Sequence, residues 1–206
     1  MKVGTDGVLL GAWCPKGTRI LDVGTGSGLI ARMLMQRCPE AEVEGIDIDE
    51  AAVEQARENG VKAYCSSLQD WQGPYDLIVS NPPYFQNSLK NPDKGREMAR
   101  HTDTLSYAEL IQHSARLLQE GGRLALILPV EAENEIRQLA AAADLFLTHV
   151  TRVYSKENKK PKRVLLAFQL KIEDLRFKIE EDSLVLEDEK GGRSLPYQEL
   201  CRDFYL

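Results

Sequence analysis

The sequence is poor in the residues that build metal sites and disulfide frameworks. It has only four cysteines among 206 residues, and none of them forms a CxxC pair. Scattered cysteines argue against a zinc site or a set of disulfide bonds, so we expect no bound metal and reduced thiols. Reduced thiols favour a cytoplasmic protein. The four positions are Cys14, Cys38, Cys65 and Cys201.

Long apolar runs are also lacking. No segment approaches the length of about 18 uncharged apolar residues that a membrane-spanning helix needs, and the start, MKVGTDG, lacks the layout of a signal peptide. A chain of 206 residues with 43% hydrophobic and 28% charged residues is typical of one globular domain. We therefore expect no membrane segment and a single domain over residues 1–206. Its expected parts are an N-terminal segment at 1–17, a core at 18–170 and an appendage at 171–206.

An overall excess of positive charge is missing too, because the net charge is −6. This total argues weakly against a nucleic-acid partner, but the charge is unevenly distributed. Residues 156–163, KENKKPKR, hold five basic side chains and one acid, whereas residues 173–206 hold ten acids and five bases. A local basic patch matters more for phosphate contact than the total does. The segment is either such a patch or a solvated loop between two strands.

Apolar runs alternate with stretches of helical spacing along most of the chain. We predict strands at 18–23, 41–47, 61–65, 76–80, 123–128, 148–154 and 164–170, and helices at 29–38, 49–59, 107–119 and 131–143. Strands alternating with helices imply a doubly wound α/β fold with a mostly parallel sheet. The last two strands are joined by the basic loop, so they are expected to form an antiparallel hairpin at the sheet edge. The tail is expected to add a strand, a turn and a short helix.

A glycine-rich loop, DVGTGSG at residues 22–28, follows the first strand and precedes a helix. Gly24 and Gly26 can adopt backbone angles that a side chain forbids, and they let a ligand approach bare backbone. The spacing is G-x-G-x-G rather than the G-x-G-x-x-G of dinucleotide sites. Asp47 ends the second strand, where an acid in nucleotide-binding sheets accepts hydrogen bonds from ribose hydroxyls. Asp49, two residues later, is interpreted as a helix cap.

The fourth strand ends in SNPPYF at residues 80–85. The simple interpretation is a turn that stops the strand, since proline has no N–H to donate. The alternative is a site for a planar group that bears an amine. The side-chain oxygen of Asn81 and the carbonyl of Pro82 would accept the two N–H bonds, and Tyr84 would stack on the flat group. This edge of an open α/β sheet is also where ligands bind.

Residues 18–170 resemble class I S-adenosylmethionine-dependent methyltransferases. The resemblance lies in four features in this order: DVGTGSG, the acid that ends the second strand, NPPY and the terminal hairpin. The resemblance implies a Rossmann-like sheet of seven strands and S-adenosylmethionine as the cofactor. It implies catalytic roles for Asn81, Pro82 and Tyr84, while Pro83 and Phe85 flank the substrate. After the third strand, many relatives place an acid near the cofactor's adenine, but this chain has Ser67 and Leu68 there, with Asp70 the nearest acid. The implied cofactor contacts are Asp22, Gly24, Thr25, Gly26, Gly28, Asp47, Ile48, Ser67, Leu68 and Asn81.

Three further segments narrow the resemblance. They are similar to segments of the tRNA1(Val) adenine-37 N6-methyltransferase family. The three are MKVGTDGVLLGAW at the start, ARHTDTLSYAELI at 99–111 and YQELCRDFYL at the end. That family usually has more residues before KVGTDG, so the chain is expected to begin late. The resemblance places Thr5 and Asp6 near the methionine end of the cofactor. Asp6 equally fits the cap of a helix at residues 7–13.

The resemblance implies tRNA as partner, with the methyl group added to an adenosine N6 amine. Basic residues of the 156–163 segment and of the loop after NPPY are the expected phosphate contacts: Arg100, His101, Lys159, Lys160, Lys162 and Arg163. We expect no DNA partner and a monomer or weak dimer. Two alternatives remain open from the residues alone. They are N5-glutamine methylation of a release factor, whose enzymes carry a helical domain ahead of this core, and a non-catalytic RNA- or cofactor-binding module.

Overall fold

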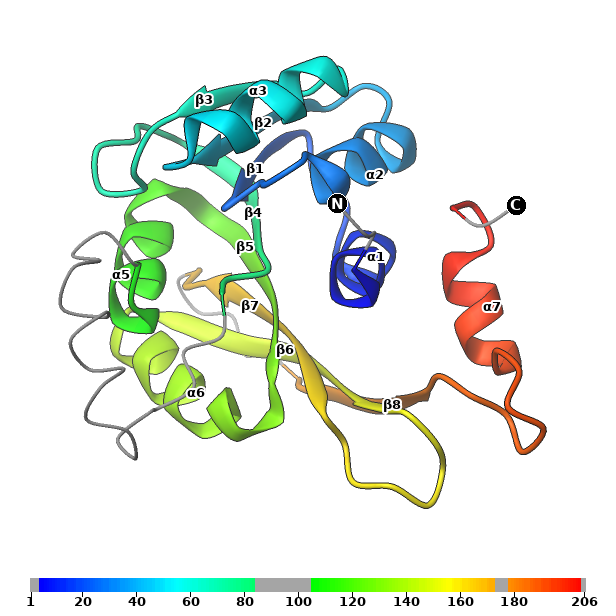
Figure 1. Ribbon diagram of the computed structural model, residues 1–206. Coiled ribbons are helices and arrows are strands. Elements are labelled where there is room, and N and C mark those ends of the chain that lie inside the picture. Colours follow the sequence, from blue (N-terminus) through cyan, green and yellow to red (C-terminus); the bar gives the residue numbers. More distant parts are fainter. Residues whose placement is uncertain (1–3, 84–104, 173–177, 205–206) are drawn as a thin grey trace, which may run out of the picture.

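The computed structural model describes residues 4–83, 105–172 and 178–204. In this part of the chain, eight strands form one sheet in the order β3-β2-β1-β4-β5-β7-β6-β8 (Figure 1). The strands are β1 (Arg19–Val23), β2 (Glu42–Asp47), β3 (Lys62–Cys65), β4 (Tyr75–Ser80), β5 (Leu118–Pro129), β6 (Leu145–Tyr154), β7 (Arg163–Leu170) and β8 (Glu180–Val185).

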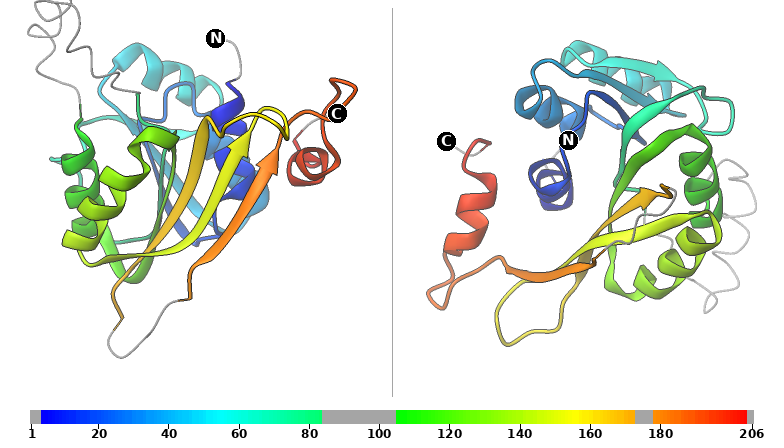
Figure 2. Two further views of the ribbon diagram at one scale, coloured as in Figure 1. Left: turned by 90° about the horizontal axis from the view of Figure 1, so that it is seen from below. Right: turned by 180° about the vertical axis from the view of Figure 1, so that it is seen from behind.

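Helices cover both faces of this sheet, as Figure 2 shows. The described helices are α1 (Thr5–Trp13), α2 (Leu29–Arg37), α3 (Glu50–Glu58), α5 (Tyr107–Leu117), α6 (Glu133–Ala142) and α7 (Leu195–Cys201), with a 3₁₀ turn at Val130–Ala132. Side chains of α1, α2, α3 and α7 share one apolar cluster, and those of α5 and α6 share the other. Successive strand residues such as Ile20 and Leu21 enter opposite clusters because side chains alternate along a strand.

The register of the parallel strands brings their carboxyl ends to one edge. Val23 of β1 pairs with Ile46 of β2 and with Ser80 of β4, while Asp47 pairs with Cys65 of β3. The segments that leave these four strands therefore start side by side. In an open α/β sheet this edge is where ligands bind.

The predicted fold class is confirmed, with two corrections at the end of the chain. β1 to β5 are parallel, and β7 is antiparallel to both β5 and β6. The sheet has eight strands rather than seven, because β8 pairs in parallel with β6. The β6–β7 hairpin is therefore not at the edge of the sheet, since β7 lies between β5 and β6 and β8 takes the edge.

The helix predicted to reach Gln119 ends earlier than expected. α5 stops at Leu117, and β5 begins at Leu118, which pairs with Tyr75 before a register shift. The segment Glu120-Gly121-Gly122, which follows the end of the predicted helix, lies within β5. Gly121 has a φ of 73°, which only glycine adopts at low cost, so the strand passes this irregularity without a break.

The N-terminal helix α1 is an interior element. Residues 7–12 are all buried, and Gly7 and Gly11 bring the helix against α2. A Cβ atom at Gly11 would lie 2.7 Å from Met33 Sδ. On the same side, Tyr197 and Cys201 of α7 join the cluster that α1 occupies. The expected strand, turn and helix of the tail are confirmed, and they pack against the N-terminal segment.

Candidate active site at the carboxyl edge of the sheet

The glycine-rich loop is held against the end of β2 by backbone hydrogen bonds. The amides of Gly24 and Thr25 both donate to the carbonyl of Ile46, at 2.9 and 3.0 Å. The next amide, of Gly26, donates to Asp47 Oδ2 at 2.9 Å. The loop thus turns over the ends of β1 and β2 in a fixed conformation.

The three glycines of the loop have positive φ angles but different surroundings. Gly24, Gly26 and Gly28 have φ angles of 69°, 54° and 81°. Among the described residues, a Cβ atom at Gly24 or Gly26 would meet no atom within 4 Å, whereas one at Gly28 would lie 2.7 Å from Val61 Cγ2. The first two glycines therefore leave open space for a ligand. The third permits α2 to begin close to Val61.

Asp22 lies beneath this loop and is completely buried. Its Oδ2 accepts hydrogen bonds from Thr25 Oγ1 at 2.7 Å and from the Ala31 amide at 3.2 Å. Its Oδ1 is buried with no hydrogen-bond partner among the described residues. Burial raises the pKa of Asp22 to about 6, an effect that these two hydrogen bonds only partly offset. In the structure, Asp22 ties the loop to the start of α2, and its role toward the cofactor stays a prediction.

Asp47 is half-buried at the end of β2. Its Oδ2 accepts from Gly26 N, and its Oδ1 accepts from the Asp49 amide at 3.0 Å. An ionised carboxylate has about four lone-pair positions, so each oxygen keeps one for a ligand. The predicted cap is confirmed, because Asp49 Oδ1 accepts from the Ala51 amide at the start of α3.

Two cavities of about 600 Å³ each meet at Gly24. One, the Asp47 cavity, is lined by Val23, Gly24, Ile46, Asp47, Ile48, Ser66, Ser67, Leu68, Gln69, Ser80, Pro82, Pro83, Leu105 and Glu109. The other, the Asn81 cavity, is lined by Gly4, Gly7, Gly24, Thr25, Gly26, Ser27, Leu29, Ile30, Arg32, Gln55, Asn59 and Asn81. The structure thus brings together most of the cofactor contacts implied by the sequence.

The end of β4 carries Asn81, Pro82 and Pro83 of the NPPY motif into this space. Ser80 Oγ donates to the Val23 carbonyl at 2.8 Å, which fixes the end of β4 beside β1. The half-buried Asn81 lines one cavity, and the buried Pro82 and exposed Pro83 line the other. Tyr84 and Phe85, predicted to stack on the substrate, lie outside the described residues, as do Arg100 and His101.

The start of α1 differs from the sequence expectation. Gly4, not Asp6, is the N-cap residue of the helix, and Asp6 lies in its first turn. Asp6 Oδ2 accepts a hydrogen bond from Arg163 Nε of β7 at 2.9 Å. Neither Thr5 nor Asp6 is among the residues lining the two cavities, although Gly4 and Gly7 line the Asn81 cavity. The cap interpretation of Asp6 is therefore wrong, and the cofactor contact stays a prediction.

The basic loop between β6 and β7 emerges at the same edge as NPPY. Pro129, at the end of β5, pairs with Arg163, and Figure 2 shows the loop at the same end of the sheet as the start of α1. Lys159, Lys160 and Lys162 are exposed, and they form no ion pair within the described ranges. Arg163, the fourth predicted phosphate contact of this segment, is instead engaged by Asp6.

Comparisons with known proteins add to this geometry. The family model described as the methyltransferase small domain matches residues 6–146. A relative from Bacteroides fragilis is 40% identical over 221 residues, covering 100% of this chain and 91% of the relative. Another, from Parabacteroides distasonis, is 44% identical over 220 residues with the same coverage. Both are named tRNA1(Val) (adenine(37)-N6)-methyltransferase. The chain belongs to this methyltransferase family.

Solved structures agree with the family on the fold. A predicted O-methyltransferase from Agrobacterium tumefaciens has a TM-score of 0.75 at 16% identity, covering 96% of both chains. A putative RNA methyltransferase from Pyrococcus horikoshii has a TM-score of 0.57 at 18% identity, covering 76% of each chain. These structures show the fold alone, and the relatives and the family model confirm the family resemblance drawn from the sequence.

Some residues that line the candidate site were not anticipated from the sequence. Glu109 and Gln69 line the Asp47 cavity beside Pro82. Hydrogen bonds from the Ser106 hydroxyl and amide lower the pKa of Glu109 and keep it ionised. The sequence SYAE at 106–109 shows the pattern of a capping box at the start of α5. The pattern does not show that Glu109 lies beside Pro82, because that contact depends on the tertiary fold.

The described residues contain neither a helix suited to span a membrane nor a cluster suited to bind a metal ion. None of the helices there combines the length and apolar character needed to cross a bilayer. No cluster of histidine, cysteine, aspartate or glutamate suited to a metal ion occurs in the same part of the chain.

Proposed function

We propose that the chain transfers the methyl group of S-adenosylmethionine to the N6 amine of an adenosine in tRNA, at position 37 as in the name of its relatives. The observation that carries this proposal is the meeting of the Asn81 and Asp47 cavities at Gly24, directly beside the NPPY strand end. Family membership supports the same reaction and cofactor.

The residues present fit S-adenosylmethionine. Gly24 and Gly26 leave open space where side chains would intrude. The two lone pairs left on the Asp47 carboxylate, one on each oxygen, match the two hydroxyls of a ribose. Ile48 is an apolar side chain that is 56% exposed in the same cavity, so it offers a surface to a purine ring. The cofactor supplies an electrophilic methyl group on a sulfonium centre.

Asn81 and Pro82 hold the target amine in this proposal. An amine attached to a planar ring is a weak nucleophile because its lone pair is delocalised into the ring. If the Asn81 side-chain oxygen and the Pro82 carbonyl accept the two N–H bonds, the nitrogen lone pair is left free for attack. The bond from Ser80 to Val23 fixes both acceptors relative to the glycine loop. Positioning of this kind is a large catalytic effect by itself.

A general base is not required by this arrangement. The nitrogen becomes strongly acidic once its bond to the methyl carbon has formed, so its proton leaves to water afterwards. Tyr84 supplies a stacking face for the target base, worth about 1–3 kcal/mol. The target must first leave its stack in the RNA, which costs a few kcal/mol and less in a single-stranded loop.

The tRNA is proposed to approach over the loop between β6 and β7. Lys159, Lys160 and Lys162 are exposed at the edge that also carries Asn81. Residues 180–182 of β8 are two glutamates and an aspartate, so this edge strand adds no basic side chain to the phosphate-binding surface. We further propose that the chain acts in the cytoplasm, on RNA rather than DNA, as a monomer or weak dimer. Free cysteines at all four positions agree with a reducing compartment.

The deciding experiment uses labelled S-adenosylmethionine with unmodified tRNA and a release factor in the same reaction. The proposal predicts label in RNA, recovered as N6-methyladenosine after digestion to nucleosides. Label in the protein fraction would favour glutamine methylation. Binding of cofactor and RNA without any label would instead identify a non-catalytic module.

A further inference from the structure

An ion pair joins the first turn of α1 to the end of the loop between β6 and β7. Arg163 Nε donates to Asp6 Oδ2 at 2.9 Å, between residues 157 positions apart. The two side chains are only 31% and 23% exposed, so solvent screens this pair less than a pair at the open surface. The contact is therefore a defined link between two distant segments of the chain.

Backbone bonds of the β6–β7 hairpin fix the arginine end of this link. Arg163 Nη1 donates to the Lys162 carbonyl at 3.0 Å, and the Lys162 amide donates to the Val153 carbonyl of β6 at 3.0 Å. The guanidinium is a planar fork, so two bonds made by different nitrogen atoms set its orientation. The hairpin thus presents an oriented cation to α1.

The aspartate end belongs to the part of α1 that faces the Asn81 cavity. Gly4 and Gly7 line that cavity, and Asp6 lies between them in the first turn. The N-cap residue is Gly4, so no capping side chain from the described residues holds the start of the helix. The bond from Arg163 to Asp6 instead restrains the turn that forms this wall of the cavity.

A second link joins the other end of the helix to the same hairpin. Trp13 Nε1 donates to Thr151 Oγ1 of β6 at 2.8 Å, and the centroids of the Trp13 and His149 rings lie 4.8 Å apart. With both ends attached, α1 takes its position from the β6–β7 hairpin. The cavity wall and the loop that carries the exposed lysines are therefore parts of one connected unit.

We propose that Arg163 is a positioning residue for methyl transfer, which acts through Asp6 to hold the first turn of α1 as a wall of the Asn81 cavity, and that it is not a phosphate contact. This inference rests on the proposed function, since it takes the reacting groups to lie beside Asn81. A wall that moves by about 1 Å misplaces the methyl donor relative to the target amine, and a shift of that size can cost up to about 100-fold in rate.

A phosphate contact would have a different signature. A side chain that neutralises one phosphate releases about one counterion, so its loss weakens RNA binding and lowers the salt slope by about 1. A positioning residue acts after the RNA has bound, so its loss lowers kcat and leaves the KM for tRNA unchanged. The two roles of Arg163 are therefore separated by which kinetic constant responds.

Steady-state methyl transfer to unmodified tRNA tests the proposal. Asp6→Ala and Arg163→Met each break the pair, so each is expected to lower kcat about tenfold, while the KM for tRNA changes by less than about twofold. The matched control is Glu181→Gln, which breaks the Arg152–Glu181 pair of 3.1 Å between β6 and β8. Glu181 lines neither cavity, and its variant is expected to keep the wild-type kcat.

The double variant Asp6→Ala/Arg163→Met adds a second measurement. Because the two residues act through one bond, its kcat should equal that of either single variant rather than fall a further tenfold or so. It also removes one charge of each sign. Its salt slope in RNA binding is therefore expected to change by less than about 0.3, where loss of a phosphate contact would lower the slope by about 1.

Several results would overturn the proposal. One is a wild-type kcat in Asp6→Ala. Another is an Arg163→Met variant whose tRNA KM rises while its kcat stays constant, which is the behaviour of a phosphate contact. A double variant with the wild-type kcat would show that the single losses come from an unpaired charge. If circular dichroism shows Arg163→Met to be unfolded, Asp6→Ala decides alone. A wild-type chain that transfers no methyl group to tRNA would instead refute the proposed function.

Discussion

At the scale of single residues, Asn81 is the side chain whose loss is expected to separate turnover from cofactor binding. Asn81→Ala removes one of the two acceptors for the target amine. We expect the rate of methyl transfer to fall by about 10²-fold, which is the effect of removing one preorganised hydrogen-bonding group from an enzyme active site. Affinity for S-adenosylhomocysteine should survive. Transfer of labelled methyl groups and calorimetry measure the two effects.

The control for this change is Asn134→Ala, an exposed amide on α6 that is expected to retain full activity. Asp47→Ala gives the opposite pattern, because it removes the carboxylate proposed for the ribose and the bond to Gly26. Asp47→Ala should weaken the affinity for S-adenosylhomocysteine, which Asn81→Ala should leave unchanged. Full activity in Asn81→Ala would remove NPPY from the mechanism.

The glycine loop offers a second pair of residue changes. Gly28→Ala places a Cβ atom 2.7 Å from Val61 Cγ2, in addition to its positive φ, so we expect a loss of more than about 2 kcal/mol in the free energy of unfolding. The added Cβ atom of Gly24→Ala meets no atom of the described residues within 4 Å, so this change should cost only about 1–2 kcal/mol. It should nevertheless weaken S-adenosylhomocysteine binding at least tenfold. Urea unfolding and calorimetry distinguish these outcomes, and undiminished binding by Gly24→Ala would place the ligand elsewhere.

Residue types and their order predicted the site well where the contacts are local. The acid that ends β2 and the cap two residues later follow from strand-to-helix geometry, and both lie as expected. The cap role of Asp6 was wrong, and the cofactor contact of Gly28 stays a prediction. Gly28 packs on Val61 and Asp6 pairs with Arg163, and such partners, 33 and 157 positions away, leave no local pattern.

At the scale of elements, the loop between β6 and β7 is the surface that we expect to meet RNA phosphates. Replacing Lys159, Lys160 and Lys162 by Gln should reduce the slope of log affinity against log salt by up to about 3, because each lost contact releases about one counterion fewer. A filter-binding series in salt measures this slope. An unchanged slope would exclude the loop from the RNA interface.

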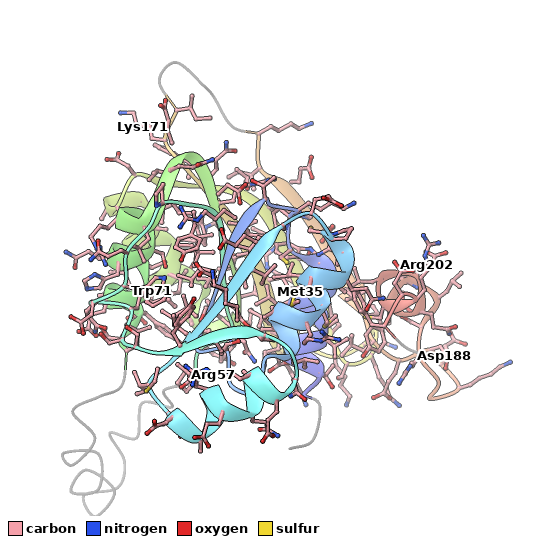
Figure 3. The ribbon with its side chains drawn as sticks, turned by 90° about the horizontal axis from the view of Figure 1, so that it is seen from above. Met35, Arg57, Trp71, Lys171, Asp188 and Arg202 are labelled. Carbon is pink, nitrogen blue, oxygen red and sulfur yellow. The ribbon has the colours of Figure 1, made fainter. Side chains whose placement is uncertain are left out.

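A matched control comes from the appendage. Changing Lys178, Lys190 and Arg202 to Gln removes the same charge, and all three are exposed. Figure 3 shows Arg202 and Asp188 at the opposite side of the molecule from Trp71. Trp71 comes two residues after Gln69, which lines the Asp47 cavity. If the loop lysines contact RNA and the appendage does not, the control should change the salt slope much less than the loop variant does.

Strand and helix periodicity predicted the alternating core, but not how the last elements join it. The hairpin was expected at the edge because its loop is short and no later strand was assigned to the sheet. The burial pattern of β8 is mostly exposed and its sequence begins with acids, so it has little of the apolar alternation that marks a strand. Its pairing with β6 includes ion pairs such as Arg152 to Glu181 at 3.1 Å.

At the scale of the whole molecule, Asp22 should make stability depend on pH. Burial raises the pKa of Asp22 to about 6 in the folded chain, whereas in the unfolded chain the pKa is the ordinary 3.8 of an exposed aspartate. The unfolded state therefore binds fewer protons between these values, and the contribution of Asp22 to stability falls as pH rises from about 4 to 6. The total loss is about 3 kcal/mol.

Asp22→Asn should lack this part of the pH dependence, since an amide does not titrate in that range. Urea unfolding of both forms at pH 4, 5, 6 and 7 measures the difference. The wild-type chain is expected to lose stability relative to the variant as pH rises. A constant difference between the two forms would show that Asp22 has an ordinary pKa in the folded state.

The central claim is that the carboxyl edge of this sheet methylates one adenosine amine in tRNA. Its most direct test compares two unmodified valine tRNA transcripts, one with adenosine and one with guanosine at position 37, each incubated with labelled S-adenosylmethionine and digested to nucleosides. The account predicts N6-methyladenosine from the first transcript and no label from the second. Equal label in both transcripts, or label in a nucleoside other than N6-methyladenosine, would contradict it.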